Sequence, residues 1–443
     1  MPFLLEMTAA DKARMHAAVL RVLAEMGVKV ENRTLLDKLR GFGAEVDLET
    51  EVARFPSRLI QEFLDRVEPP AAPDSPRPAV YAGTGIYMGK YLNPATGRHE
   101  DWTERKLADY VKVARALPGI DGVEMLCCPV AGVPGEIHPL YSKYLNWKLG
   151  MSHVNYAVHD TAMIPYIEEF HQIRAEALKL DCAKSLRCGV FMISPLKFGR
   201  TEAEQFVYFA ERGYKAFIAA MISMGGSGPV TAPGSVAVHL AEQIFTNIMN
   251  FIYYGTRSLY FGASISPLDM RNSGFCYGRP EKAVANLMFG QMAEFYRAES
   301  YNQTGVADAK VPGSEAAAQK LITALPDLVW FRYCSIGAGL LSVDEVCSPI
   351  QLIIDHEMVG ALRRLIQPEP INDDTLGFDA LVEAGHGGVF TDKMHTALHC
   401  REAVWAPELW TADLFAALGG QGSQESRRPG VGEVARDHGR SGS

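Results

Sequence analysis

The sequence predicts an α/β fold: a (β/α)8 TIM barrel with additional N-terminal and C-terminal helices. From about Asp121 to Ser335, short apolar runs alternate with segments of helical periodicity. Near-continuous apolar strands separated by helices are typical of a parallel sheet that helices cover. Polar, glycine-rich segments follow several of these expected strands. Barrel enzymes carry their reacting groups at that end of the strands.

Residues 1–80 are expected to form a separate helical region that ends in a proline-rich linker. Apolar residues recur there at helical spacing, and prolines are frequent between Pro69 and Pro78. The expected helices are Ala9–Met26, Thr34–Gly43 and Phe55–Val67.

Residues 81–366 are expected to form the catalytic barrel. Strands are expected at Val123–Cys128, His153–Val158, Arg187–Ile193, Ala216–Ile222, Leu259–Ile265, Tyr301–Val306 and Leu328–Ser335. Helices are expected at Asp160–Leu178, Thr201–Arg212, Ser235–Tyr253, Glu281–Arg297 and Ser348–Ile366. The eighth strand comes either from Tyr81–Ile86 or from Gly388–Phe390. Residues 367–418 are expected to be a C-terminal helical region, and residues 419–443 a disordered tail rich in Gly, Ser and Arg.

Composition excludes several classes of protein. The 443 residues are 48% hydrophobic and carry a formal charge of −9, which argues against nucleic acid as the main partner. We see neither an apolar window long enough to span a membrane nor the basic and apolar regions of a signal peptide. We therefore expect a cytoplasmic protein without a membrane partner, whose eight cysteines are free thiols.

A glycine-rich segment, GGSGPVT at residues 225–231, follows an expected strand. Glycine lets the backbone turn with positive φ and lets a ligand approach closely, so Gly225, Gly226 and Ser227 are candidates for contact with a cofactor. The segment matches neither the P-loop nor the dinucleotide-binding fingerprint. A plain tight turn is the alternative.

Three carboxylates near expected strand ends are candidates for the site. Glu242 lies among apolar neighbours on the helix after the glycine-rich segment, and the alternative is a solvated helix residue. Asp269 and Arg271 come just after the next strand. They would either pair with each other or cap the next helix, or Arg271 would bind a carboxylate of the substrate. Asp308 would lie at the mouth of the barrel, where Lys310 could pair with it. The alternative is that Asp308 caps the following helix.

Aromatic side chains lie near the ends of several expected strands. Most are expected in the core, but a subset at the mouth would suit a quaternary ammonium ion, which aromatic faces attract within about 6 Å. The candidates are Tyr156, Phe191, Tyr260, Phe275, Tyr277, Tyr301 and Tyr333.

The densest histidine group is His386, His395 and His399. The spacing of the last two suits zinc, but no cysteine or carboxylate set completes a site. We therefore favour packing or hydrogen bonding for these residues and expect no metal.

Nine segments, in order, resemble the trimethylamine methyltransferase family, which also includes glycine betaine methyltransferases that lack pyrrolysine. They run from about Met7 to about Trp410, and their order carries the resemblance. The segments are VLAEMGVKVEN, GFGAEVD, NPATGRHEDWT, ISPLKFGRTEAEQFVYFAERG, GGSGPVTAPGSVAVHLAEQI, DMRNSGF, GVADAKVPGSEAAAQK, SPIQLIIDHEM and GHGGVFTDKMHTALHCRE.

The resemblance implies a TIM barrel that moves a methyl group from a quaternary amine or betaine to the Co(I) corrinoid of a separate protein. Such an enzyme has to hold the cation, align the C–N bond and exclude water, while the cofactor carries the difficult chemistry. Glu242 and Asp308 would be catalytic. The substrate-binding residues would be Asn155, Tyr156, Asp269, Arg271, Tyr277, Tyr301 and Tyr333.

The corrinoid (cobalamin) is expected on a partner protein rather than tightly bound to this chain. The corrinoid-binding signature DxHxxG is absent, since DHEMVG at residues 355–360 has Glu357 in place of the histidine. We also expect a homo-oligomer.

Three departures from the family pattern leave other functions open. The sequence contains no pyrrolysine, which argues against trimethylamine itself as the substrate. Asn93 stands where many relatives carry Asp, and Ile336 lies near a position where some betaine-using members carry His. The alternatives are a TIM-barrel metal-dependent hydrolase or lyase, and a non-catalytic relative that binds quaternary amines.

Overall fold

The computed structural model describes residues 6–70, 79–85, 89–125, 129–151, 156–157, 161–182 and 186–410. Helices and strands are mixed along the chain. The chain divides into two compact units, Met1–Leu352 and Ile353–Ser443. The first unit therefore contains both the N-terminal helices and the parallel strands.

The N-terminal helices lie where the sequence predicts them. They are α1 (Ala9–Arg21) with its continuation η1 (Val22–Met26), α2 (Arg33–Phe42) and α3 (Ser57–Asp65). Thr8 and Asp11 form a capping box that starts α1. Three short strands between these helices were not predicted, because three residues are too few for a readable alternation. They are β1 (Val28–Val30), β2 (Glu45–Asp47) and β3 (Val52–Arg54), in a sheet of order β2-β3-β1-β9 with β9 (Lys197–Phe198).

Parallel strand pairs make up the centre of the first unit. The strands are β4 (Val80–Gly83), β7 (Tyr156–Ala157), β8 (Arg187–Phe191), β10 (Lys215–Ala219), β11 (Ile222–Met224), β12 (Tyr260–Ala263), β13 (Ile265–Asp269), β15 (Glu299–Asn302) and β16 (Cys334–Gly337). The parallel pairs are β7 with β8, β8 with β10, β11 with β13, β12 with β15, and β16 with β4. A further parallel bridge joins Gly83 to Gly122.

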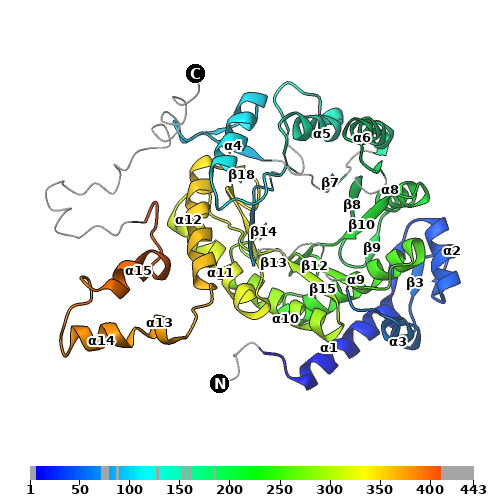
Figure 1. Cartoon of the computed structure of the whole chain (residues 1–443). Coiled ribbons are helices and arrows are strands. Elements are labelled where there is room, and N and C mark those ends of the chain that lie inside the picture. The colour runs from blue at the N-terminus through cyan, green and yellow to red at the C-terminus, as the bar shows by residue number, and fades with distance from the viewer. Residues whose placement is uncertain are drawn as a thin grey trace. The chain divides into compact units, whose positions relative to one another are not determined.

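Helices pack against one face of these strands. They are α4 (Glu104–Ala116), α5 (His138–Lys148), α6 (Ile164–Leu178), α8 (Arg200–Glu211), α9 (Ala232–Tyr254), α10 (Pro280–Phe295) and α11 (Ser314–Phe331). Figure 1 shows α8, α9, α10 and α11 on the outer side of strands β8 to β15. Val190 of β8 and Ile218 of β10 are buried in one core with Phe206 of α8 and Ile244 of α9. The helices therefore cover alternate residues of each strand.

The unit also contains short strands that pair in antiparallel fashion, except that β18 and β5 are parallel. The hairpin of β17 (Leu340–Leu341) and β18 (Val346–Cys347) joins β5 (Lys90–Leu92) and β6 (His99–Glu100) in the order β17-β18-β5-β6. β14 (Gly274–Phe275) folds back on β13. Two short 3₁₀ helices, η2 (Gly135–Ile137) and η3 (Thr161–Met163), precede α5 and α6.

Several expected strand positions were wrong. The strand expected at Leu328–Ser335 begins only at Cys334, because α11 continues to Phe331 and ends at Arg332, which has a φ of 57°. Buried Ala324 and Leu328 lie four residues apart on one face of that helix. The strand expected at Tyr301–Val306 begins two residues earlier and ends four residues earlier, at Glu299–Asn302.

Of the two candidates for the eighth strand, Tyr81–Ile86 overlaps a parallel strand: β4 pairs with β16 from Val80 opposite Cys334 to Gly83 opposite Gly337. The alternative, Gly388–Phe390, lies in the second unit and forms no strand. It occupies a turn in which the Gly388 N–H donates to the Gly385 carbonyl oxygen at 3.2 Å.

The second unit begins within α12 (Pro349–Leu365) and continues through α13 (Asp373–Leu376), α14 (Phe378–Ala384) and α15 (Met394–Ala403). Glu357 of α12 accepts hydrogen bonds from the N–H groups of Leu409 and Trp410 at 3.1 and 3.3 Å. The tail expected to be disordered, residues 419–443, lies outside the described residues. In the described parts of both units, no helix is both long enough and apolar enough to cross a membrane.

Candidate functional site

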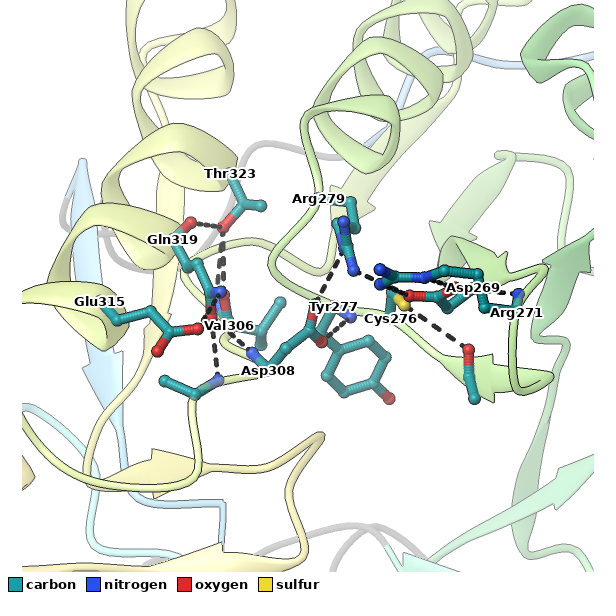
Figure 2. Close-up of polar contacts among 12 residues, drawn as sticks. Asp269, Arg271, Cys276, Tyr277, Arg279, Val306, Asp308, Glu315, Gln319 and Thr323 are labelled. Atoms are coloured by element: carbon teal, nitrogen blue, oxygen red, sulfur yellow. Dashed lines mark hydrogen bonds and ion pairs between the residues drawn. The ribbon is translucent and has the colours of Figure 1, made fainter.

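The segments after β13 and β15 meet through a network of four charged side chains (Figure 2). Arg271 donates from Nε to Asp269 Oδ1 at 2.8 Å and from Nη2 to Oδ2. Arg279 lies between the two carboxylates, with Nη2 3.1 Å from Asp269 Oδ2 and Nε 3.7 Å from Asp308 Oδ2. The hydrogen bonds from Arg271, then the charges of both guanidinium groups, hold the pKa of Asp269 well below its ordinary range.

Asp308 fixes the segment before α10 to the segment after β15. Its Oδ1 accepts a hydrogen bond from the Tyr277 N–H, and its own N–H donates to Gln319 Oε1 at 2.8 Å (Figure 2). Its Oδ2 is buried and accepts no hydrogen bond from the residues that the structure describes. Asp308 does not cap α11, whose N-cap is Gly313, and Lys310 donates to Ser342 Oγ instead of pairing with Asp308.

Glu242 is fully buried on α9, which rules out the solvated helix residue that the sequence left open. Its Oε1 accepts from the Leu196 N–H at 2.9 Å, and its Oε2 accepts from the Ser194 hydroxyl at 3.0 Å. His239 Nδ1 lies 3.2 Å from the same Oε2, and His239 Nε2 lies 2.8 Å from the Gly262 carbonyl oxygen. Glu242 and His239 therefore connect the loop after β8 to β12.

The glycine-rich turn after β11 uses its own N–H groups. The N–H groups of Gly226, Ser227 and Gly228 all donate to the Ser223 carbonyl oxygen at 3.0 Å. Gly225 has a φ of 87°, and a Cβ at Gly226 would lie 2.7 Å from a Leu268 methyl carbon. The turn and its packing explain these glycines, and contact of Gly225, Gly226 and Ser227 with a cofactor stays a prediction.

The parallel strands expose aromatic rings on the face opposite the helices, which we call the inner face. Side chains alternate along β8 and β10, so the residues between the buried ones belong to this face. Phe191 is 40% exposed, Phe217 37% and Tyr260 of β12 48%. Gly189 makes room for one ring, since its Cβ would lie 2.4 Å from a Phe217 ring carbon. These exposed rings are open to contact with a ligand on this face.

The other predicted aromatic residues take different places. Tyr277 is buried, with its ring 5.3 Å from that of Phe275 and 5.1 Å from Lys282 Nζ. The Tyr301 hydroxyl lies 3.3 Å from Ser335 Oγ, and the Tyr301 and Tyr333 rings are 6.5 Å apart. The side chain of Tyr156 and the whole of Asn155 lie outside the described residues.

Sequence reasoning missed Lys282, which is fully buried on the first turn of α10. Its Nζ donates to Ser266 Oγ at 3.1 Å and to Gln303 Oε1 at 3.2 Å. Burial lowers its pKa to about 7. A lysine near a helix start reads as a surface residue, so no signal in the sequence marks it.

The histidine group lies in the second unit. His395 Nε2 is 3.0 Å from the Asp374 carbonyl oxygen, and His399 Nε2 is 3.3 Å from Asp374 Oδ1. Within the described ranges, no three or more His, Cys, Asp or Glu side chains gather as a metal site would require.

Comparison with known proteins identifies the family. Residues 1–434 match the family described as trimethylamine methyltransferase (MTTB). The chain belongs to this family. The resemblance inferred from the nine segments is therefore confirmed.

Individual relatives of the family are distant. The trimethylamine methyltransferase MttB of Desulfitobacterium hafniense is 23% identical over 410 residues, which cover 87% of this chain and 80% of that protein. A glycine betaine methyltransferase of the same species is 26% identical over 219 residues, 49% of this chain and 46% of that protein. The solved monomethylamine methyltransferase (MtmB) of Methanosarcina barkeri is 14% identical over 82% of this chain and 76% of its own, with a TM-score of 0.46.

Proposed function

We propose that this family member moves a methyl group from a quaternary amine or betaine to the Co(I) corrinoid of a separate protein. The accessible aromatic rings on the inner face carry the proposal. A quaternary ammonium ion has no N–H, so hydrogen bonds cannot hold it, whereas aromatic faces attract its spread charge. Phe191, Phe217 and Tyr260 present such faces on three different strands.

The corrinoid would supply the nucleophile, and the amine would leave with the electron pair of the broken C–N bond. A quaternary ammonium already has a neutral leaving group, so the protein needs no strong general base. Its residues have to bind the cation, align the C–N bond and keep water out. Glu242 and Asp308 suit this work by fixing the loop after β8 and the segment before α10.

We also propose that the parallel strands close into the eight-stranded barrel. In order, the strands would be β4, Gly122–Met125, β7, β8, β10 with β11, β12 with β13, β15 and β16. Described bonds support seven of the eight contacts, including Ile222 N–H to the Ser264 carbonyl and Gly337 N–H to the Gly305 carbonyl. The eighth, between Gly122–Met125 and β7, borders on residues outside the described ranges.

The domain limits at residues 80, 366 and 418, the homo-oligomer and the cytoplasmic location stay predictions. Within the proposed barrel, the segments after β11, β13 and β15 would all follow the carboxyl ends of strands, and we expect them at one rim.

Anaerobic methylation of Co(I) cobalamin, followed by its absorbance, tests the proposed function. We expect turnover with at least one of glycine betaine, choline, carnitine and tetramethylammonium. If the protein binds one of these amines tightly but methylates neither free cobalamin nor cobalamin on a corrinoid protein, it is a binding protein instead. Turnover that needs an added metal and no corrinoid would favour a hydrolase or lyase.

A further inference from the structure

One carboxylate, Glu124, contacts Tyr81 and lies near enough to Tyr301 for its charge to act on that hydroxyl, and the Tyr333 ring lies beside Tyr301. Tyr81 belongs to β4, Glu124 to the Gly122–Met125 segment, and Tyr301 to β15, while Tyr333 precedes β16. All four side chains are half-buried, so each is partly accessible. Sequence reasoning singled out Tyr301 and Tyr333 but neither Tyr81 nor Glu124.

The backbone and side chain of Glu124 are both fixed. The Glu124 N–H donates to Thr84 Oγ1 at 2.8 Å, and the Thr84 hydroxyl donates back to the Glu124 carbonyl oxygen at 2.7 Å. The Tyr81 hydroxyl donates to Glu124 Oε1. A Cβ on Gly122 would lie 2.1 Å from the Tyr81 hydroxyl oxygen and 2.8 Å from Glu124 Oε1. The pair therefore occupies the space that only a glycine at 122 leaves open.

Strand register links the other two rings to this pair through Ser335. Tyr81 lies opposite Ser335 in the pairing of β4 with β16. Ser335 Oγ is 3.3 Å from the Tyr301 hydroxyl, and the Tyr301 ring is 6.5 Å from that of Tyr333. Burial, then the hydrogen bond to Glu124, raises the pKa of Tyr81, so this hydroxyl keeps its proton. Burial also raises the pKa of Tyr301, and the charge of Glu124 adds to the effect.

We propose that Tyr81, Glu124, Tyr301 and Tyr333 seat the quaternary ammonium head of the substrate, with Glu124 as its counter-charge. The inference rests on the proposed function and names the residues that recognise the cationic end. Neutral aromatic faces beside one carboxylate match a cation that cannot make hydrogen bonds. The tertiary amine left after methyl transfer no longer carries the fixed charge, so it loses this attraction and can leave.

The counter-charge acts on the bound substrate more than on the transition state, because the positive charge of the amine is lost during the reaction. An interaction that is stronger in the ground state lowers KM without raising kcat. Glu124→Gln should therefore raise KM about tenfold and leave kcat unchanged or higher. A residue that merely supports the fold would lower kcat and stability together.

Two ligands of the same shape test the role of charge directly. Choline and its carbon isostere 3,3-dimethyl-1-butanol differ only in the charged nitrogen. We expect the full-length protein to bind choline at least about tenfold more tightly by calorimetry, and Glu124→Gln to remove most of that preference. Glu136→Gln, at an exposed glutamate in η2, is the matched control and should change neither affinity.

Two results would overturn the proposed binding site. One is a wild-type protein that binds choline no more tightly than the isostere, and the other is an equal loss of affinity for both ligands in Glu124→Gln. If that variant does not fold, Tyr301→Leu provides the test, because losing a ring face should weaken choline more than the isostere. These binding measurements need no corrinoid. A choline preference without methylation of Co(I) cobalamin, whether free or on a corrinoid protein, would contradict the proposed function alone. Methylation without the preference would contradict the proposed binding site alone.

Discussion

His239 Nε2 lies 2.8 Å from the Gly262 carbonyl oxygen, while His239 Nδ1 lies 3.2 Å from Glu242 Oε2. A carbonyl oxygen only accepts hydrogen bonds, so Nε2 carries a proton. The contact between Nδ1 and the carboxyl group needs a second proton, on either the ring or the carboxyl group. In both cases the pair is neutral overall, which allows two fully buried ionisable side chains to remain in the core.

Removing Glu242 should therefore destabilise the protein strongly. Glu242→Ala leaves the His239 ring and the Leu196 N–H without their acceptor, and we expect the free energy of unfolding to fall by about 3–5 kcal/mol in urea. Glu242→Gln keeps an acceptor and should cost only about 1–2 kcal/mol. The control Glu204→Ala, at an exposed position of α8, should change the free energy of unfolding by less than about 0.5 kcal/mol. A Glu242→Ala protein as stable as this control would show that the pair does not hold the loop.

The long elements of the fold could be predicted because their apolar pattern is periodic. The helix expected at Ser235–Tyr253 is α9, Ala232–Tyr254, which ends at Gly255 in a left-handed conformation. The strand expected at Arg187–Ile193 contains β8. The prediction of a strand at Leu328–Ser335 was wrong, because an apolar run at the end of a helix has the same composition as a strand.

The site was harder to predict, because it depends on contacts between distant segments. Glu242 could be suspected from its apolar neighbours. Glu124 and Tyr81 could not, because their contact depends on the bridge from Gly83 to Gly122. Phe217 lies within an apolar strand, and only the structure shows that its ring is exposed rather than packed under a helix.

Arg271 should affect carboxylate-bearing ligands selectively. Its side chain is 81% exposed, and Arg279 also pairs with Asp269, so Arg271 can turn to a ligand without leaving that carboxylate unpaired. We expect Arg271→Ala to weaken the binding of glycine betaine about tenfold in calorimetry, because the bidentate interaction with its carboxylate is lost. The affinity for tetramethylammonium should not change. Arg105→Ala, at an exposed arginine of α4, is the control. Equal weakening of both ligands would mean that Arg271 is structural.

Binding of a cation should depend on the protonation of Asp344. Burial raises the pKa of this half-buried carboxyl group to about 6, and its charge adds to that of Glu124 in raising the pKa of Tyr301. A nearby cation favours the ionised form, so affinity should be full above that pKa and fall as the pH drops through it. We expect choline to bind about three- to tenfold more weakly at pH 5 than at pH 7.5.

Asp344→Asn is the control for this pH dependence. The variant should bind choline weakly at both pH values, because it has no charge to lose. A pH dependence that persists in Asp344→Asn would assign the titration to another group. Backbone contacts hold the Asp344 turn in place, with the Ser342 N–H 2.9 Å from the Ala309 carbonyl oxygen and the Val343 N–H 3.0 Å from that of Ala307.

Gly122 should be sensitive to the smallest side chain. The Cβ of Gly122→Ala would lie 2.1 Å from the Tyr81 hydroxyl oxygen, so the hydroxyl must move away from Glu124. We expect choline to bind at least about tenfold more weakly, because the displaced ring and carboxylate no longer face the same cation. Gly41→Ala on α2, where an added Cβ meets nothing within 4 Å, provides the matched control. It should leave choline affinity unchanged and, as a helical Gly→Ala change, raise the free energy of unfolding by about 0.5–1 kcal/mol. A Gly122→Ala protein that binds choline as tightly as Gly41→Ala does would show that Tyr81 and Glu124 need not stay paired to hold the cation.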